Sequence, residues 1–241
     1  MLRKEKLCLR IALSALAVGL AVARSAHAAD PSEEVKRITE SIDVLKQLTT
    51  TPDAEIPKYV LDRAEAIVVI PTLVKGGFVV GAEHGNGVMS VRDRRTAQWS
   101  PPSFVKLTGG SIGWQIGLQS VDLVLVVTNR EGVDDLLKSE FTLGGSASVA
   151  AGPVGRSAEA STDALMGAKI LAYSRARGLF AGATFEGSSL RSDDDANRRF
   201  YGRAVSAKAL AEGVDVPKVP PAAREWRRAV SATVGEARMS R

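Results

Sequence analysis

The stretch GGSASVAAGPVGRSAEAST (residues 144–162) and its continuation AKILAYSRARGLFAGATFEGSSL (residues 168–190) decide the predicted fold. Apolar and polar residues alternate through much of both segments, which is the period of a half-buried β-strand. Arg177-Gly178 lies between two alternating runs and predicts a tight hairpin. Both segments are rich in Gly, Ala and Ser, and such small residues permit sharp bends and close approach of backbones, as at the corners of a small barrel.

Further strands are expected upstream of this stretch. Apolar or alternating runs over residues 66–70, 77–83, 88–92, 104–118 and 121–127 predict them. Pro71 is expected to end the first strand, and Asn86-Gly87 to mark a hairpin between the second and third. The sequence therefore predicts an α+β domain with a strongly bent, mainly antiparallel β-sheet or barrel of about eight strands. N- and C-terminal helices are expected to pack on it.

Two amphipathic segments predict those helices. Residues 33–48 follow Ser32, a suitable N-cap, and carry apolar side chains at three- and four-residue spacing. Their polar face is slightly acidic, so we expect this helix to pack on the domain rather than to enter a membrane surface, which favours Lys and Arg. Residues 222–238 repeat the helical pattern, with Trp226, Val230 and Val234 along one side.

The first 28 residues have the three parts of a secretory signal peptide. A basic start precedes an apolar run, and Ala26-His27-Ala28 fits the cleavage rule. These residues contain five basic and one acidic side chain, so their removal lowers the formal net charge from +5 to +1. A nearly neutral chain argues against general nucleic-acid binding, which needs a clustered basic surface. The predicted division is a signal peptide (1–28), an N-terminal amphipathic helix (29–53), a β-rich core (54–202) and a C-terminal helical extension (203–241).

Groups suited to catalysis or to metal binding are scarce. After residue 28 the sequence contains one histidine, His84, and no cysteine. A zinc site needs several such ligands, and a Ser-His-Asp hydrolase would have to use His84. The spacing of Asp193, Asp195 and Asn197 resembles a calcium loop, but Arg198 occupies the position that requires Gly. We therefore expect no enzymatic activity, no cofactor and no metal.

Five segments, in order, resemble the SYLF domain family. They are Lys75-Gly76-Gly77-Phe78, Trp99-Ser100-Pro101-Pro102-Ser103, Gly152-Pro153-Val154-Gly155-Arg156 with Ala158-Glu159-Ala160, Tyr173-Ser174 through Gly187, and Asn197 through Gly202. The similarity spans residues 54–202. This resemblance implies a non-enzymatic domain that binds anionic phospholipids with phosphoinositide-like headgroups at a membrane surface. Some eukaryotic relatives also bind actin, so a protein-interaction module without a lipid role is the alternative.

Basic side chains are the candidate lipid ligands, because guanidinium groups bind phosphate in a bidentate manner. The candidates are Arg156, Arg175, Arg177, Arg198, Arg199 and Lys75. Each could instead lie on a solvated face or form a salt bridge, and Asp122 is expected to be a hydrogen-bonded structural carboxylate. Trp226, Arg227 and Arg228 are candidates for membrane contact, although burial of that helix against the barrel is an equal alternative. The expected partners are thus an anionic phospholipid or membrane surface and a possible protein, without nucleic acid. The expected location is periplasmic or secreted.

Overall fold

The computed structural model describes residues 32–48, 56–138, 140–144, 148–154, 167–176, 179–182, 187–214, 216 and 218–239. Residues Glu33–Arg241 form one compact unit. Its helices are α2 (Glu33–Leu48), α3 (Lys58–Asp62), α4 (Arg130–Leu136), α6 (Asp194–Tyr201), α7 (Ala207–Glu212) and α8 (Pro221–Met239). Its strands are β1 (Ala66–Val91), β2 (Ser103–Val127), β3 (Glu140–Thr142), β4 (Val149–Ala151), β5 (Ile170–Ala176), β6 (Leu179–Gly182) and β7 (Ser189–Ser192).

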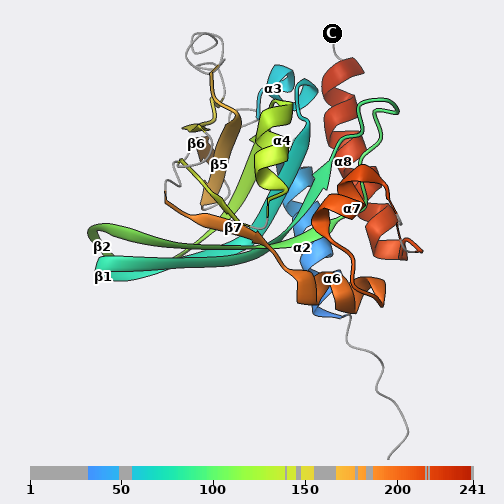
Figure 1. Cartoon of the computed structure of the whole chain (residues 1–241). Coiled ribbons are helices and arrows are strands. Elements are labelled where there is room, and N and C mark those ends of the chain that lie inside the picture. The colour runs from blue at the N-terminus through green and yellow to red at the C-terminus, as the bar shows by residue number, and fades with distance from the viewer. Residues whose placement is uncertain are drawn as a thin grey trace, which may run out of the picture. The chain divides into compact units, whose positions relative to one another are not determined.

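A long two-stranded ribbon of β1 and β2 forms the centre of the sheet. The two strands pair antiparallel along their length, with Ala66 opposite Val127 and Met89 opposite Ser103. The ribbon bends back on itself, so the two ends of β1 approach each other (Figure 1). At Gly87, an added Cβ atom would lie only 2.2 Å from the carbonyl oxygen of Val69. Glycine is needed here because the two arms of one strand meet backbone to backbone.

The remaining strands extend the ribbon into a curled sheet with the strand order β3-β7-β2-β5-β4. β5 pairs with the C-terminal half of β2, and β7 pairs with its N-terminal half. All strand pairs in the described residues are antiparallel except β4 with β5. The predicted α+β class and the strongly bent, mainly antiparallel sheet are therefore confirmed.

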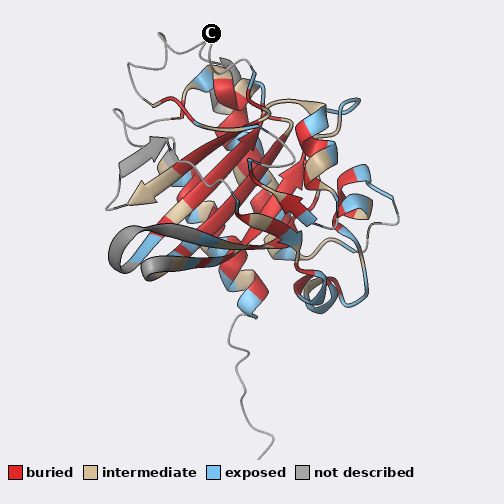
Figure 2. Cartoon of the chain, turned by 60° about the vertical axis from the view of Figure 1, so that its left-hand side comes forward, coloured by how far each residue is buried: buried red, intermediate tan, exposed pale blue. Residues whose placement is uncertain are grey.

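Helices cover both faces of the sheet. Because successive side chains of a strand point to opposite faces, Ile67 and Val69 contribute to one core, which includes Leu45 of α2 and Trp226 of α8. Val68 contributes to a second core, together with residues of α4 and α7. Figure 2 shows the strands as the most continuously buried elements. The run from Leu123 to Val127 consists entirely of leucine and valine, and its complete burial matches this position between two helical layers.

Two expectations about β1 are wrong. Pro71 does not end the strand, because β1 continues through a register shift between Ile70 and Leu73. Asn86-Gly87 is not a hairpin, since both residues pair with β2 in mid-strand. Glycine is common in turns, but here Gly85 and Gly87 lie in mid-strand and allow the two arms of the bent β1 strand to approach each other closely. Ala176 lies opposite Leu179 in the β5–β6 pair, and the expected hairpin residues Arg177-Gly178 lie outside the described residues.

The two helices expected from the sequence lie where they were predicted, as α2 and α8. Ile38 and Leu45 of α2 are buried, so this helix packs on the domain as expected. Asp193 caps α6 by accepting a hydrogen bond from the Ala196 N–H, and Gly202 ends the helix with a left-handed backbone. No described helix is long and apolar enough to span a membrane.

Candidate functional site

One side of α8 is buried in the core that contains Ile67 and Val69 of β1 and Leu45 of α2. Trp226, Val230 and Val234 lie at helical spacing and are all buried. The Trp226 indole N–H donates a hydrogen bond of 2.7 Å to Ser90 Oγ, and Ser90 donates in turn to the Ser100 carbonyl oxygen. Trp226 is 0% exposed, so its assignment to membrane contact is wrong. The apolar ring fills the core, and the buried N–H has found the partner that burial requires.

The opposite side of α8 carries arginines above an open groove. Residues three and four apart share one face of a helix, and this brings Arg224, Arg227 and Arg228 together. The groove has a volume of about 610 Å³, and residues 97–99 of the β1–β2 connection form its other wall. Arg227 Nη2 donates to Gln98 Oε1 across it at 3.3 Å. A guanidinium has five N–H donors, so this contact leaves donors for a ligand.

The β1–β2 connection adds two more exposed arginines. Asp93 Oδ1 accepts hydrogen bonds from the backbone N–H groups of Arg95 and Thr96 and from the Thr96 hydroxyl. The hydrogen bonds from Thr96 hold the pKa of Asp93 below its ordinary value. This closed turn presents Arg94 and Arg95 to solvent.

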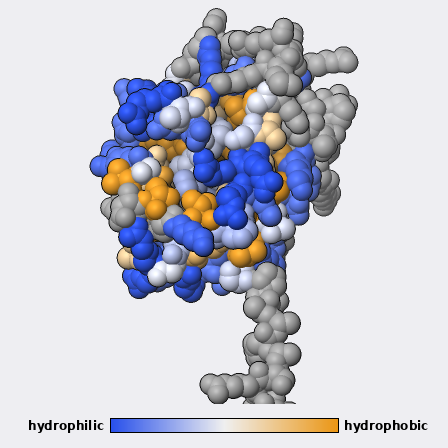
Figure 3. Space-filling model, turned by 90° about the vertical axis from the view of Figure 1, so that its right-hand side faces the viewer, coloured by the Kyte–Doolittle hydropathy of each residue, from blue (hydrophilic) through white to orange (hydrophobic). Residues whose placement is uncertain are grey.

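We call Arg94, Arg95, Arg224, Arg227 and Arg228 together the arginine face. Within residues 92–98 and 221–231 the acidic residues are Asp93 and Glu225, so these two segments carry a net positive charge. Figure 3 shows this side of the molecule, where strongly hydrophilic side chains gather around small hydrophobic patches. The arrangement can bind an acidic or phosphate-bearing partner.

The other predicted ligands that lie within the described residues each contact a carboxylate of the fold. Arg175 forms an ion pair with Asp122, and Asp122 Oδ1 also accepts a hydrogen bond of 3.1 Å from the Thr72 backbone N–H. Asp122 is thus the structural carboxylate that was expected. Lys75 Nζ lies 3.3 Å from Glu83 Oε2 and joins the two arms of the β1 bend.

The predicted pair on α6 also makes internal contacts. Arg199 Nε donates to Glu34 Oε1 of α2 at 2.7 Å, and Arg198 Nη1 lies 3.7 Å from Asp195 Oδ1. Both arginines therefore form salt bridges within the protein, which was the stated alternative to a role in lipid binding. Arg156 and Arg177 lie outside the described residues.

A buried ionic cluster lies next to Arg199. Arg37 Nη1 donates to Asp193 Oδ2 at 3.0 Å, and Lys106 Nζ lies 3.0 Å from Asp193 Oδ1. Burial alone would raise the pKa of Asp193, but the hydrogen bonds from Lys106, Arg37 and the Ala196 N–H outweigh it and lower that pKa. Every acidic oxygen of Asp193 is occupied, so this cluster joins α2, β2 and α6 rather than binding a ligand.

The lone histidine after residue 28 does not lie in the hairpin loop considered from sequence. His84 is exposed and lies within β1 rather than in a loop. Among the described residues there is no group of three or more His, Cys, Asp or Glu side chains that could hold a metal ion.

The chain belongs to the SYLF family: the family model described as "Las17-binding protein actin regulator" matches residues 108–233. This match continues past residue 202, where the expected resemblance ended, and it includes most of α8. Over 176 residues the chain is 42% identical to Protein YSC84 of Saccharomyces cerevisiae, covering 71% of this chain and 36% of the relative. It is 41% identical over 175 residues to LAS seventeen-binding protein 3 of the same yeast, covering 70% and 37%.

An animal relative is also similar. SH3 domain-containing YSC84-like protein 1 of Homo sapiens is 33% identical over 188 residues, which cover 77% of this chain and 54% of the relative. The chain therefore spans between 36% and 54% of the length of these relatives. The family names describe binding and regulatory proteins rather than enzymes.

Sequence reasoning found only part of the arginine face. It singled out Arg227 and Arg228 but not Arg94 and Arg95. The available signal was the Asp93-x-x-Thr96 pattern, in which an acidic side chain closes a turn on its own backbone and thereby exposes the arginines between.

Proposed function

We propose that this chain is a non-catalytic binding module whose partner is an acidic protein of the actin type, and that the arginine face is its contact surface. Membership of a family described as an actin regulator carries the proposal. The relatives' names point to protein partners, and the chain's own residues supply a surface with the matching charge.

The geometry of the arginine face supports this reading. Arginine is enriched at protein interfaces because its planar group binds carboxylates in a bidentate manner. α8 is fixed in the core through Trp226, so Arg224, Arg227 and Arg228 project from a rigid element. A rigid array loses less conformational entropy on binding than a flexible one.

Co-sedimentation of the purified chain with actin filaments tests the proposal. We expect saturable binding that weakens with added salt, because exposed charges are screened. The triple variant Arg224→Gln, Arg227→Gln, Arg228→Gln should lose at least about tenfold in affinity, since each lost charge contact at an interface costs about 1 kcal/mol or more. Lys36→Gln with Lys46→Gln is the matched control, because both lysines lie exposed on α2. Absence of sedimentation, or equal binding by both variants, would contradict the proposal.

An anionic phospholipid surface is the second candidate, and the same arginine face is the observation that favours it. Guanidinium groups bind phosphate as they bind carboxylate. Vesicles of phosphatidylcholine with increasing phosphatidylserine or phosphoinositide should then recover the protein in proportion to the anionic fraction. The triple arginine variant should reduce recovery, and Arg156→Ala should reduce it further if Arg156 is a lipid ligand as the sequence suggested. Binding to filaments without binding to these vesicles would eliminate this candidate.

We also propose that residues 1–28 direct export and are removed. This rests on their basic, apolar and small-residue pattern. The intact mass of the protein recovered from the periplasm or medium of an expressing bacterium tests it, with cleavage after Ala28 expected. A full-length product retained in the cytoplasm would be contrary to it.

A further inference from the structure

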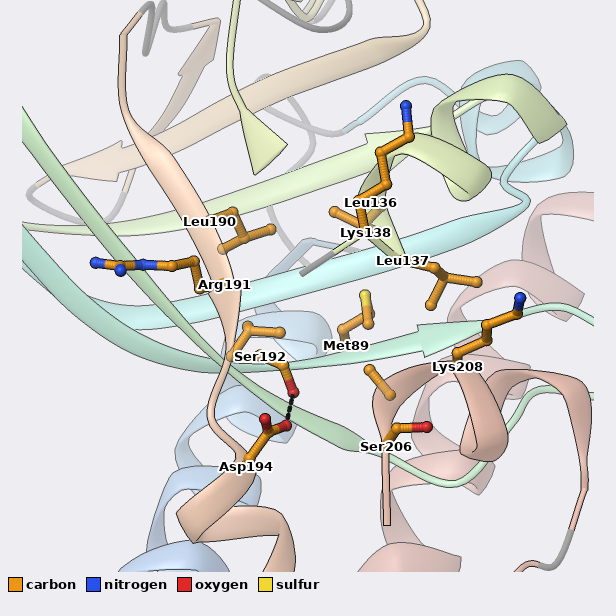
Figure 4. Close-up of a pocket in the computed structure, with 12 residues that line it drawn as sticks. Met89, Leu136, Leu137, Lys138, Leu190, Arg191, Ser192, Asp194, Ser206 and Lys208 are labelled. Atoms are coloured by element: carbon orange, nitrogen blue, oxygen red, sulfur yellow. Dashed lines mark hydrogen bonds between the residues drawn. The ribbon is translucent and has the colours of Figure 1, made fainter. Parts of the chain in front are cut away.

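A second hollow, separate from the arginine face, opens between β7, α4 and the start of α7. Its volume is about 310 Å³, which lies at the lower end of ligand pockets. The apolar part of its lining comes from β1, β2, α4 with its C-cap, β7 and the first residue of α7, and consists of Met89, Val105, Leu136, Leu137, Leu190 and Ala207. In Figure 4 Met89, Leu137 and Leu190 surround the same open space.

Cationic side chains stand at the edge of this pocket. Lys138 follows α4 and Lys208 belongs to α7, and both are mostly exposed, at 62% and 65%. Each lysine has an acidic neighbour three or four residues away in the sequence. Lys138 Nζ lies 2.6 Å from Asp135 Oδ1, whereas Lys208 Nζ lies 3.8 Å from Glu212 Oε1. The looser Lys208 contact leaves that ammonium group able to turn toward a ligand.

The polar residues at the two ends of the pocket differ in charge and in hydrogen-bonding capacity. Asp194 accepts a hydrogen bond of 2.6 Å from Ser192 Oγ, and both lie across the pocket from Lys138 (Figure 4). Ser206 Oγ accepts from the Ala209 N–H, so its own hydrogen remains to be donated. Arg191 of β7 is the other exposed cation of the lining, and in Figure 4 its guanidinium points away from the space between Met89, Leu137 and Leu190. Lys208 and Ser206 therefore form an anion-compatible end, and the Asp194 carboxylate disfavours an anion at the other.

We propose that this pocket binds a single-chain anionic amphiphile, with an aliphatic chain on the apolar lining and a carboxylate or phosphate headgroup at Lys208 and Ser206. The volume has room for roughly ten carbon atoms, if a methylene group fills about the volume of a water molecule. This site is independent of the arginine face, and it requires neither a protein partner nor a bilayer.

Isothermal titration calorimetry of the full chain with octanoate, decanoate and dodecanoate tests the proposal, below the concentrations at which they form micelles. Each added methylene should tighten binding about fourfold until the pocket is full. Decanol should bind at least about tenfold more weakly than decanoate, and decyltrimethylammonium should not bind, because the headgroup end is cationic. A lysophosphatidic acid of matched chain length distinguishes a phosphate-bearing source from a free fatty acid.

Two variants locate the binding. Ala207→Leu should fill the pocket and abolish binding, and Lys208→Gln should weaken decanoate about tenfold while leaving decanol unchanged. Lys46→Gln is the control, since Lys46 is equally exposed and lies near an acidic neighbour on α2. If Ala207→Leu does not fold, the chain-length series and Lys208→Gln decide the matter. No binding, equal affinity for decanoate and decanol, or equal loss in Lys208→Gln and Lys46→Gln would overturn the proposal.

Discussion

Arg37 and Asp193 form an ion pair of 3.0 Å between residues 156 positions apart in the sequence. Their side chains are only 6% and 2% exposed, so the pair is almost fully withdrawn from water. It joins the first turns of α2 to the N-cap of α6, and Arg37 also lies over the Phe104 ring at 5.4 Å. This contact connects the N-terminal helix to a segment that the sequence places far away.

Removal of Arg37 should leave the buried Asp193 Oδ2 without its ion-pair partner, although Lys106 still contacts Oδ1. We expect Arg37→Ala to lower the free energy of unfolding by about 3 kcal/mol, because a buried ion loses one of its partners. Urea denaturation at neutral pH measures this change. Lys36→Ala, on the exposed side of the same helix, should alter stability by less than about 0.5 kcal/mol. Equal effects of the two substitutions would show that the buried pair does not stabilise the fold.

The same pair predicts a pH dependence. The pKa of Asp193 is lower in the folded state than in the unfolded state. Its stabilisation is therefore present above the ordinary aspartate pKa of about 3.9 and is lost as the pH falls through the lower folded value. Asp193→Asn should remove part of the acid-induced loss of stability, measured as urea midpoints from neutral pH down to about pH 3. An unchanged slope in the variant would contradict this assignment.

The bend of β1 depends on Gly87. Gly87→Ala would place a Cβ atom 2.2 Å from the Val69 carbonyl oxygen, so backbone must move. We expect a loss of about 2–3 kcal/mol or failure to fold, as for overpacked cores. Gly110→Ala is the matched strand control, because the nearest atom to its Cβ would be 3.8 Å away. Thermal unfolding compares them, and similar melting temperatures for both variants would refute the close approach.

Trp226 is a core residue with one polar contact. Trp226→Phe keeps an aromatic ring but leaves Ser90 Oγ without this donor, and should cost about 1–2 kcal/mol. Ser90→Ala in a double-mutant cycle should show a coupling of about 1 kcal/mol. Neither substitution should reduce vesicle binding per folded molecule. A selective loss of vesicle binding in Trp226→Phe would return this residue to the membrane-contact role.

Thr72 has a left-handed backbone conformation with φ of 59°. Asp122 accepts its N–H, and Arg175 holds Asp122 in place. Thr72→Gly should be neutral or stabilising by up to about 1 kcal/mol, because glycine adopts this conformation without steric cost. Asp122→Ala should be destabilising by about 2–3 kcal/mol, since it breaks both contacts. Chemical denaturation of the two variants checks the opposite signs.

Local patterns predicted the two long helices and the middle of the sheet. The Ser32 start and apolar stripe of α2, and the spacing of Trp226, Val230 and Val234 in α8, are short-range signals, and each helix forms where its signal indicated it. The apolar run at residues 121–127, interrupted only by Asp122, identified the middle of the sheet. These features depend on residues within a few positions of one another, so periodicity and capping rules detect them.

The arginine face could be predicted only in part, because two segments far apart in sequence form it. Arg227 and Arg228 were visible as a basic helical surface. The meeting of α8 with the β1–β2 connection, where Arg227 bonds to Gln98, depends on tertiary packing, and residue spacing contains no such information. For the same reason, the sequence left open whether Arg175 and Arg199 bind a ligand or form salt bridges, and their partners Asp122 and Glu34 appear only in the structure.

By itself the sequence determined the α+β class, the small residues that permit a bent sheet, and the shortage of groups for catalysis. Tertiary structure alone decided that Asn86-Gly87 lies in mid-strand, that Trp226 is in the core, and which arginines remain on the surface. The physical reason is that a glycine is equally suited to a turn and to a close approach of backbones, and an arginine to solvent and to a buried carboxylate. Only the long-range packing of β1 against itself and of α8 against the sheet selects between these states.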